Sequence, residues 1–244
     1  MRATLSAAAA VFVLSTHPAL ADCTDGPKKG VDWSGCDKKI IMLVEANLVG
    51  ANLSRVNFTS TDLRRANLAT ARLDRTNLTY TSLRGANLAG ASMFKAYGYR
   101  TDLSDADLSS ANMSFNELYR ADISKSKLAN VDLSRAAMPR ADFSKADLAG
   151  ADLSKADFIR ANFDGADLTS ANLSFAMVAR ASFKGATLEQ SDWSNTYLYR
   201  TNLIGADLSG VKGLVQTQIM QSCGDSSTIL PQGITAPEWW PCDE

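Results

Sequence analysis

Arginine recurs at every twentieth residue from Arg100 to Arg200, with five tyrosines close by in the sequence. A guanidinium group has a planar fork of donors that suits carboxylate and phosphate, and a tyrosine ring suits sugars or other flat groups. If residues twenty apart are neighbours in space, these side chains could bind an extended anionic partner. The arginines are Arg100, Arg120, Arg140, Arg160, Arg180 and Arg200, and the tyrosines are Tyr97, Tyr99, Tyr119, Tyr197 and Tyr199.

Residues suited to catalysis or metal binding are scarce by comparison. His17 is the only histidine, and the sequence has no phosphate-binding loop, nucleophile motif or cluster of metal ligands. Aspartate is frequent, but it recurs with asparagine at one position of a short repeat, where such short side chains bond nearby backbone groups of turns. We therefore expect no enzymatic activity, no cofactor and no metal site.

The elements that position the arginines must follow from a repeat of five residues. From Ala46 to Gly210 the chain divides without insertion into 33 blocks, with alanine first in 22 of them and an apolar residue third in all but the block of Gly98. On an α-helix, five residues advance about 500°, so the apolar positions would spiral around every face. On a straight strand, five is odd, so each block would turn its core residue into water.

A backbone that turns by about 90° per block buries this pattern, because the first and third positions then point inward in every block. Four blocks close one square coil, and coils stack at ~4.8 Å, the ordinary spacing of strands. The chain then forms about eight coils in which residues twenty apart are neighbours. One interior row is entirely leucine: Leu48, Leu68, Leu88, Leu108, Leu128, Leu148, Leu168, Leu188 and Leu208.

Blocks such as Ala46–Gly50 and Ala151–Lys155 resemble those of the pentapeptide repeat family. The resemblance covers roughly residues 41–214 and implies an all-β fold, the right-handed quadrilateral parallel β-helix. The flanks Gly30–Asp37, Gly213–Gln218 and Ser222–Asp225 are similar to the ends of exported bacterial members. We read these flanks as caps, because a solenoid exposes an apolar cross-section and unpaired backbone at each end.

The N-terminal residues predict export. Arg2 is followed by a short apolar run at Ala7–Leu14 and by the small-x-small sequence Ala19–Ala21, so a signal peptidase would cut after Ala21. The apolar run is too short for a membrane span, and no later segment qualifies, so we expect a periplasmic or secreted protein without a transmembrane anchor. The predicted organisation is a signal peptide at 1–21, an N-terminal cap at 22–40, the repeat at 41–210 and a C-terminal helix with an extended cap at 211–244.

Four cysteines lie at the two ends of the chain, and an even number in an exported protein suggests disulfides. Three pairings are possible. We expect Cys23–Cys36 and Cys223–Cys242, since a long rigid solenoid would separate the two ends. The adjacent tryptophans Trp239 and Trp240 are expected to cover the last coil, with a ligand platform as the alternative.

The function predicted from these features is that of a non-catalytic binding or scaffold protein. Its partner would be an anionic polymer of the cell envelope or an acidic protein. In the alternative interpretation the arginines are only solvated, with their stems covering the coil edges and with exposed pairs to nearby carboxylates. Those pairs would be Arg100–Asp102, Arg120–Asp122 and Arg140–Asp142. The neighbouring column is Arg55, Arg75, Lys95, Phe115, Arg135, Lys155, Phe175 and Asn195.

Two other functions are conceivable for a chain of this kind. The family resemblance raises DNA mimicry directed at a type II topoisomerase. Loss of Arg2 would leave 24 basic against 26 acidic residues, and this weak charge, the export signal and the arginines all oppose nucleic acid mimicry and nucleic acid binding. A polysaccharide-acting β-helix enzyme would need a cleft, whereas an unbroken repeat predicts a smooth rod. Gly98, the one interior defect, is expected to mark local repacking, with a small ligand niche as the alternative.

Overall fold

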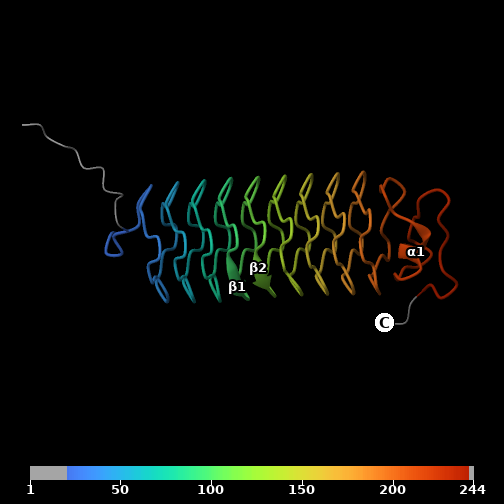
Figure 1. Cartoon of the computed structure of the whole chain (residues 1–244), viewed down its shortest axis with the longest axis horizontal. Coiled ribbons are helices and arrows are strands. Elements are labelled where there is room, and N and C mark those ends of the chain that lie inside the picture. Colours follow the sequence, from blue (N-terminus) through green and yellow to red (C-terminus); the bar gives the residue numbers. More distant parts are fainter. Residues whose placement is uncertain (1–20, 242–244) are drawn as a thin grey trace, which may run out of the picture.

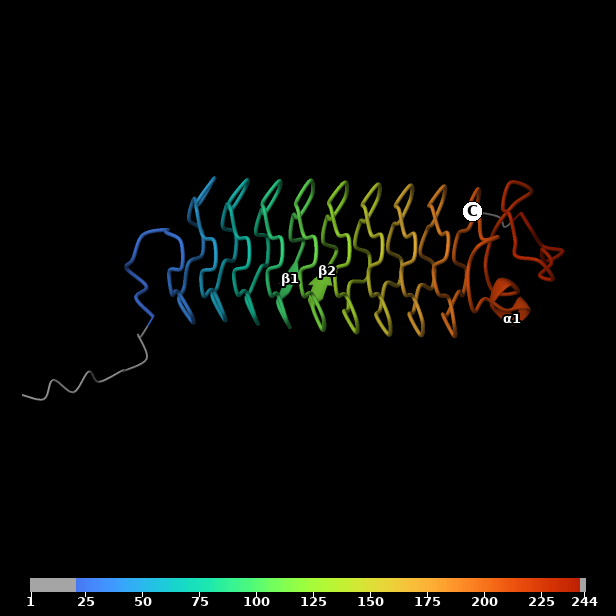
Figure 2. The same ribbon diagram turned by 90° about the horizontal axis from the view of Figure 1, so that it is seen from above.

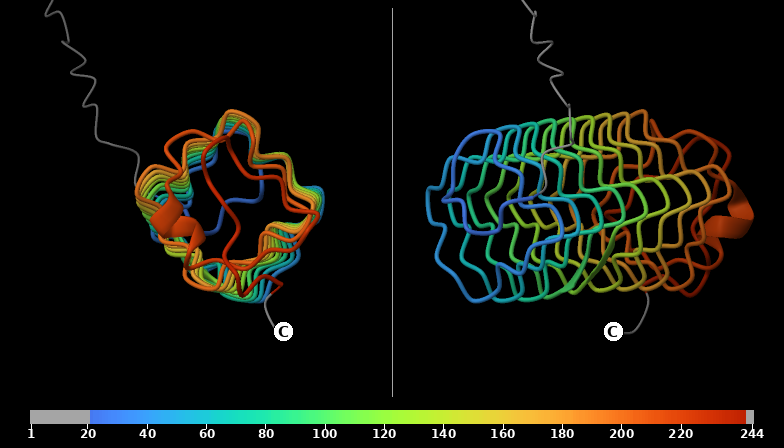
Figure 3. Two further views of the ribbon diagram at one scale, coloured as in Figure 1. Left: turned by 90° about the vertical axis from the view of Figure 1, so that its right-hand side faces the viewer. Right: turned by 60° about the vertical axis from the view of Figure 1, so that its left-hand side comes forward.

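The described part of the chain forms a straight rod of stacked coils that runs from its N-terminal segment at one end to the region of helix α1 (Gln216–Ile219) at the other (Figure 1, Figure 2). The structure, a computed structural model, describes residues 21–241. Seen along its axis, the rod has a four-cornered outline in which successive coils superimpose (Figure 3). The predicted signal peptide, apart from Ala21, lies outside the described residues, and so do Cys242–Glu244.

Each coil is twenty residues long. Parallel bridges join residues twenty apart, such as Asn47 with Asn67 and Asp147 with Asp167, and this offset holds from Asp32 to Lys212. Two three-residue strands, β1 (Tyr97–Tyr99) and β2 (Glu117–Tyr119), pair in parallel with the same offset. The pairing confirms four blocks per coil and the predicted β-helix.

A turn at the end of every block makes the corners. The backbone N–H of a first-position residue donates to the carbonyl of the third position before it, as from Ala151 to Leu148 at 3.0 Å. The residue in the fifth position has a φ near +60°, such as 67° at Gly150 and 61° at Arg160. This left-handed conformation costs an L-residue about 1–2 kcal/mol and costs glycine little. Side chains at the fifth position therefore stand on the outer corners of the rod.

The first and third positions fill the interior. The predicted leucine row is buried along its whole length. In a neighbouring row, Phe163 stacks between Phe143 and Phe183 with ring centres 4.8 Å apart on both sides and interplanar angles of 4° and 6°. This stacking gives the rise of one coil, 4.8 Å, and the same rise separates successive side chains on the outside.

The coil begins earlier than the repeat motif indicates. Asp32 pairs with Asn52 and Asp37 pairs with Asn57, and Trp33 occupies the interior with 1% of its surface exposed. Residues 31–40, predicted as part of the cap, thus adopt the backbone of a coil. The Cys23–Cys36 disulfide, with Cα atoms 5.6 Å apart, ties the preceding segment to this first coil as predicted.

The C-terminal segment closes the other end. The short helix α1 (Gln216–Ile219) follows the last regular coil and buries Ile219. The chain then returns to the rod, where Cys223 pairs with Asn202 and Ile229 pairs with Asp207, so the residues around α1 lengthen the offset beyond twenty. The predicted Cys223–Cys242 bridge stays a prediction, because Cys242 lies outside the described residues.

The tryptophan pair divides between two roles. Trp240 packs on Gly224, where an added Cβ would lie 2.4 Å from its ring, and its indole N–H donates to the carbonyl of Ser222 at 2.9 Å. The side chain of Trp239 is 51% exposed. Trp240 is therefore part of the cap, whereas Trp239 is available to a ligand.

Candidate binding face

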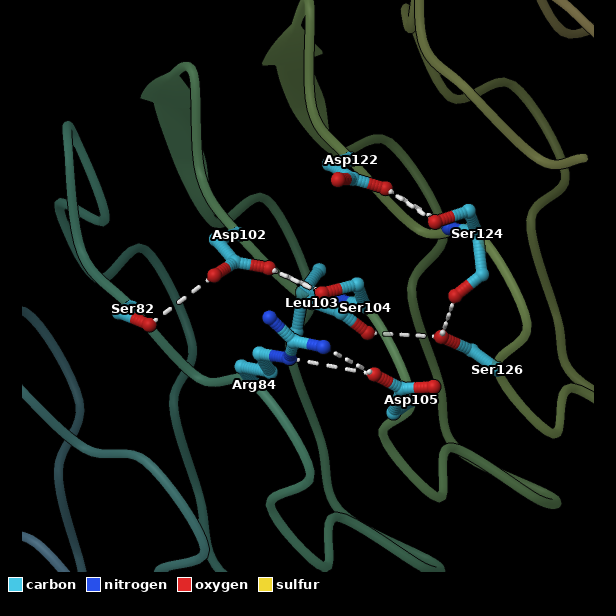
Figure 4. A network of polar contacts seen from close by, with 9 residues as sticks. All are labelled: Ser82, Arg84, Asp102, Leu103, Ser104, Asp105, Asp122, Ser124 and Ser126. Atoms are coloured by element: carbon cyan, nitrogen blue, oxygen red, sulfur yellow. Dashed lines mark hydrogen bonds and ion pairs between the residues drawn. The ribbon is translucent and has the colours of Figure 1, made fainter.

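Most outward side chains in the second position of a block serve the turns. The Oδ1 atom of Asp152 accepts the backbone N–H of Ser154 at 2.9 Å, and Asp132 accepts that of Ser134 in the same way. Further bonds link coils, such as Asn162 Nδ2 to Asp142 Oδ1 at 3.1 Å. Figure 4 shows such a network around Asp102 and Asp122. These carboxylates therefore belong to the repeat, as their periodicity predicts.

One face of the rod departs from this rule, and we call it the tyrosine face. It comprises residues 96–100, 116–120, 136–140, 156–160, 176–180 and 196–200. In these six blocks, only Asp157 caps a turn, by accepting the N–H of Ile159 at 2.9 Å. The other second positions are Tyr97, Glu117, Ala137, Met177 and Tyr197, and the fourth positions are Tyr99, Tyr119, Pro139, Ile159, Ala179 and Tyr199.

Apart from Met42 in the first coil, the exposed apolar side chains of the coils gather on this side of the rod. Within residues 43–212, every exposed large apolar side chain belongs to the tyrosine face or to one of the two corners beside it. They form two groups, one from Tyr80 to Tyr119 and one from Phe175 to Tyr199, and exposed apolar groups of this kind are typical of interaction sites. The side chains are Tyr80, Tyr97, Phe115, Tyr119, Phe175, Met177, Tyr197 and Tyr199.

Gly98 marks the place where the chain on this face straightens into β1. A Cβ atom at Gly98 would lie 2.7 Å from Thr101 Oγ1 and 2.9 Å from the carbonyl carbon of Leu78. Only glycine fits such a close approach of backbone. The defect in the interior pattern is therefore a tight contact that positions Tyr97 and Tyr99, in agreement with local repacking.

The six predicted arginines, which we call the arginine column, form one edge of the tyrosine face. They stand on a single corner in successive coils, with φ between 52° at Arg100 and 61° at Arg160. The guanidinium carbons of Arg100 and Arg200 lie 5.5 Å and 5.8 Å from the ring centres of Tyr99 and Tyr199. The structure thus brings the predicted arginines and tyrosines together on one surface.

The arginine column has no ion pair within residues 21–241, where the salt bridges all lie between residues 25 and 105. The predicted carboxylate pairs of this column are therefore wrong. The carboxylates in question instead accept backbone N–H groups two residues later, at 2.9–3.0 Å. The pairs that do not form are Arg100–Asp102, Arg120–Asp122 and Arg140–Asp142.

The opposite edge of the face, which we call the mixed column, combines basic and aromatic side chains. Lys95 Nζ lies 5.6 Å from the ring centre of Phe115, and the guanidinium carbon of Arg135 lies 5.3 Å from it. These contacts hold the cations without neutralising them. The mixed column runs through Arg55, Arg75, Lys95, Phe115, Arg135, Lys155, Phe175 and Asn195.

Hollows follow the tyrosine face, so the rod is not as smooth as its unbroken repeat predicts. Smaller residues, such as Ala137 and Ala179, lie between the tyrosines at the two ends of the face and line some of these hollows. Two shallow hollows of about 360 Å³ and 410 Å³ lie along the arginine column. A larger one, of about 940 Å³, lies where Arg180, Tyr199 and Arg200 meet Trp239 of the cap. The hollows along the arginine column therefore end at the C-terminal cap.

Neither a metal centre nor a membrane span is found in the described part of the chain. Residues 21–241 contain no group of three or more potential metal ligands. No helix within the same range is long and apolar enough to cross a membrane.

Comparison with known proteins agrees with this architecture. Eight copies of the pentapeptide repeat model match within residues 43–74, 71–97, 99–135, 117–154, 138–174 and 179–212. No curated protein sequence matches the chain significantly. Similar solved structures include HetL, a pentapeptide repeat protein involved in heterocyst differentiation regulation from the cyanobacterium Nostoc sp. strain PCC 7120. HetL is 24% identical, over 84% of this chain and 91% of HetL, with a TM-score of 0.48.

Two further structures belong to the same comparison. Full-length QnrB1, a plasmid-mediated fluoroquinolone resistance protein, is 16% identical over 83% of this chain and 94% of its own, with a TM-score of 0.46. A pentapeptide repeat protein from the Arabidopsis thaliana thylakoid lumen is 28% identical over 50% and 68%, with a TM-score of 0.15. The repeat model covers more than half of the chain, and the twenty-residue coil is the one that five-residue blocks require. This chain belongs to the pentapeptide repeat family.

Proposed function

We propose that this protein is an exported, non-catalytic binding protein that holds an extended anionic polymer of the cell envelope on its tyrosine face. One observation carries the proposal. The exposed large apolar side chains within residues 43–212 lie on the same side of the rod as a row of six arginines that form no ion pair within residues 21–241. Aromatic rings beside guanidinium groups suit a partner that has both flat sugar surfaces and negative charges.

The spacing of the arginine column suits a partner with regular charge. The rise of 4.8 Å per coil repeats without interruption from Arg100 to Arg200, so the column spans roughly 24 Å by the strand spacing. Like charges at this spacing repel one another, and no carboxylate within residues 21–241 pairs with them. An anionic chain bound along this corner would reduce the repulsion between the arginines in every coil.

The backbone gives no reason for arginine at this corner. From Gly30 to Gly205 every fifth position has a left-handed conformation, in which glycine is the least strained residue. The other two corners use glycine repeatedly, for example at Gly90 and Gly165. Between residues 55 and 200 the arginine column and the mixed column contain no glycine. The basic side chains are thus kept where the fold would favour a smaller residue, which supports a role in binding.

DNA mimicry and polysaccharide cleavage are less well supported by the same surface. A mimic of DNA needs a row of negative charges, and the tyrosine face has positive edges. The aspartates that an enzyme would need are mostly occupied by the N–H groups of turns, as at Asp132 and Asp152. A protein that only binds needs neither feature.

The proposal is tested by reversing the charge of three residues of the arginine column. The triple variant Arg160→Glu, Arg180→Glu, Arg200→Glu should lose affinity capture of polymer from envelope extracts, while its melting temperature stays that of the wild type. The matched control is Lys125→Glu, Lys145→Glu, Lys184→Glu, which changes the net charge equally on other surfaces. Unchanged capture by the arginine variant would contradict the proposal.

The class of partner and the export are tested separately. Protease digestion of the extract should leave capture intact, because the proposed partner is a polymer; loss of capture would instead identify an acidic protein. Mass spectrometry of the protein from its native cells should show an N-terminus at Asp22. A chain that retains residues 1–21 in the cytosol would contradict export.

A further inference from the structure

Asn116 is a buried polar residue that the fold does not use. It occupies the first position of its block on the tyrosine face, with 0% of its surface exposed. Its Oδ1 and Nδ2 atoms have no hydrogen-bond partner within residues 21–241. The residues one coil before and one coil after it are Ala96 and Ala136, so the interior at this position accommodates alanine. A buried amide without partners is destabilising and calls for an explanation.

The fold has a standard way to accommodate a polar first position. A hydroxyl there donates to the carbonyl of the residue 23 positions earlier, as from Thr76 to Leu53 at 3.0 Å and from Thr196 to Leu173 at 2.8 Å on this same face. Asn116 is the only asparagine in the first position of the 33 blocks, and it makes no such bond. The same bond is made by Thr61, Thr81, Thr101, Ser126 and Thr201.

A hollow lies outside Asn116, at the mixed column. Its volume of about 490 Å³ is within the range of small-molecule sites. Three cations line it, together with the rings of Tyr97 and Phe115 and the carboxylate of Glu117. Within residues 21–241, neither these cations nor Glu117 form a salt bridge with one another or with other residues. The three cations are Arg75, Lys95 and Arg135.

We propose that this hollow is a binding site for an acidic sugar. The carboxylate or phosphate of the sugar binds the three cations, and its ring lies against Phe115 and Tyr97. Its hydroxyl groups donate to Glu117. The amide of Asn116, which has no exposed surface in the free protein, turns toward the hollow and meets one polar group of the sugar. Each otherwise unpaired group of the hollow then has a partner. The site lies on the edge of the tyrosine face opposite the arginine column, so the two proposals can fail separately.

The decisive variant is Asn116→Thr, because threonine can make the bond to the carbonyl 23 residues earlier that the fold uses elsewhere. Binding of D-glucuronate and of glucose 6-phosphate is measured by titration calorimetry, with glucose as the neutral probe and sodium chloride at equal ionic strength. The wild type should bind one or both acidic sugars and not glucose. The variant should bind at least tenfold more weakly and melt about 2–4 °C higher, the shift expected when one unsatisfied group is removed from a protein of this size.

Two controls make the result unambiguous. Asn116→Ala, which matches Ala96 and Ala136 in the neighbouring coils, should lose binding in the same way. The Arg160, Arg180, Arg200 triple variant should bind the sugars as the wild type does, since it lies on the other edge. The proposal is overturned if the wild type binds neither acidic sugar beyond the salt control, or if Asn116→Thr binds as tightly as the wild type.

Discussion

The tyrosine face and the other three faces of the rod share one interior but differ outside. Phe158 behind the tyrosine face and Phe163 behind its neighbour are both fully buried. On the other faces, the outward Asp and Asn side chains mostly cap turns, as Asp167 does for Thr169 at 2.9 Å. On the tyrosine face five of six blocks lack this cap. In a repeat protein, departures from the repeat on one face therefore point to function, whereas conformity points to stability.

The largest expected effect is a loss of stability when a buried side chain behind the tyrosine face is removed, in contrast to an exposed side chain on it. Phe158 packs edge-to-face on Phe143 and Phe163, with ring centres 5.6 Å and 5.4 Å apart. Phe158→Ala should lower the free energy of unfolding by about 3–5 kcal/mol. Tyr199→Ala, on the same face but 42% exposed, should cost less than about 1 kcal/mol and weaken polymer binding. Urea denaturation and binding assays on both variants check the separation; equal losses of stability would contradict it.

Substitutions can remove the turn cap from a regular face and introduce the Asp of the repeat on the tyrosine face. Asp167→Ala removes an acceptor for both the backbone N–H and the hydroxyl of Thr169. It should cost about 1 kcal/mol of stability and leave polymer binding unchanged. The reciprocal double variant Tyr197→Asp, Tyr199→Ser gives one block of the tyrosine face the Asp and Ser of a regular block. It should weaken polymer binding without loss of stability. If Asp167→Ala impairs binding as much as the double variant does, binding is not confined to the tyrosine face.

Acid should act on stability through Asp207. The Ser209 hydroxyl and backbone N–H hold the pKa of Asp207 below its usual value, so the folded chain binds this proton less readily than the unfolded chain. The stability from this group is present above the unfolded pKa of about 3.9 and is lost as the pH falls below it. Asp207→Asn should therefore show a smaller drop in urea midpoint between pH 6 and pH 3 than the wild type. An identical drop in both proteins would contradict this assignment.

The smallest expected effect concerns salt and the arginine column. Unpaired like charges one coil apart repel, and salt screens them. Raising ionic strength should stabilise the wild type slightly, by less than about 0.5 kcal/mol. Arg180→Asn, which places a residue that tolerates positive φ at this corner, should reduce that gain. Melting curves at several salt concentrations measure it, with Lys125→Asn as control; an equal change in the control would assign the effect to net charge alone.

The coil, its interior rows and the neighbours of each arginine could be predicted because five-residue periodicity allows only one way to bury the first and third positions. The start at Val31 could not, because Lys38 breaks the apolar pattern within the first coil. The predicted carboxylate pairs of the arginines were wrong, and spacing alone could not decide them, because Asp62 both accepts a turn N–H and pairs with Arg64, whereas Asp102 accepts the turn N–H and forms no ion pair within residues 21–241. The sequence marks the tyrosine face by second positions that lack Asp and Asn. It also marks Asn116, which is the only asparagine at a first position of the 33 blocks.

Chemical-shift mapping is the most direct test of the claim that binding belongs to the tyrosine face. The mature chain, labelled with nitrogen-15, is titrated with an oligogalacturonate of defined length as the anionic polymer probe. The account predicts that perturbed amides cluster in residues 97–100, 117–120, 137–140, 157–160, 177–180 and 197–200. Perturbations spread evenly over the four faces, or concentrated on the corner of Lys125 and Lys145, would contradict it.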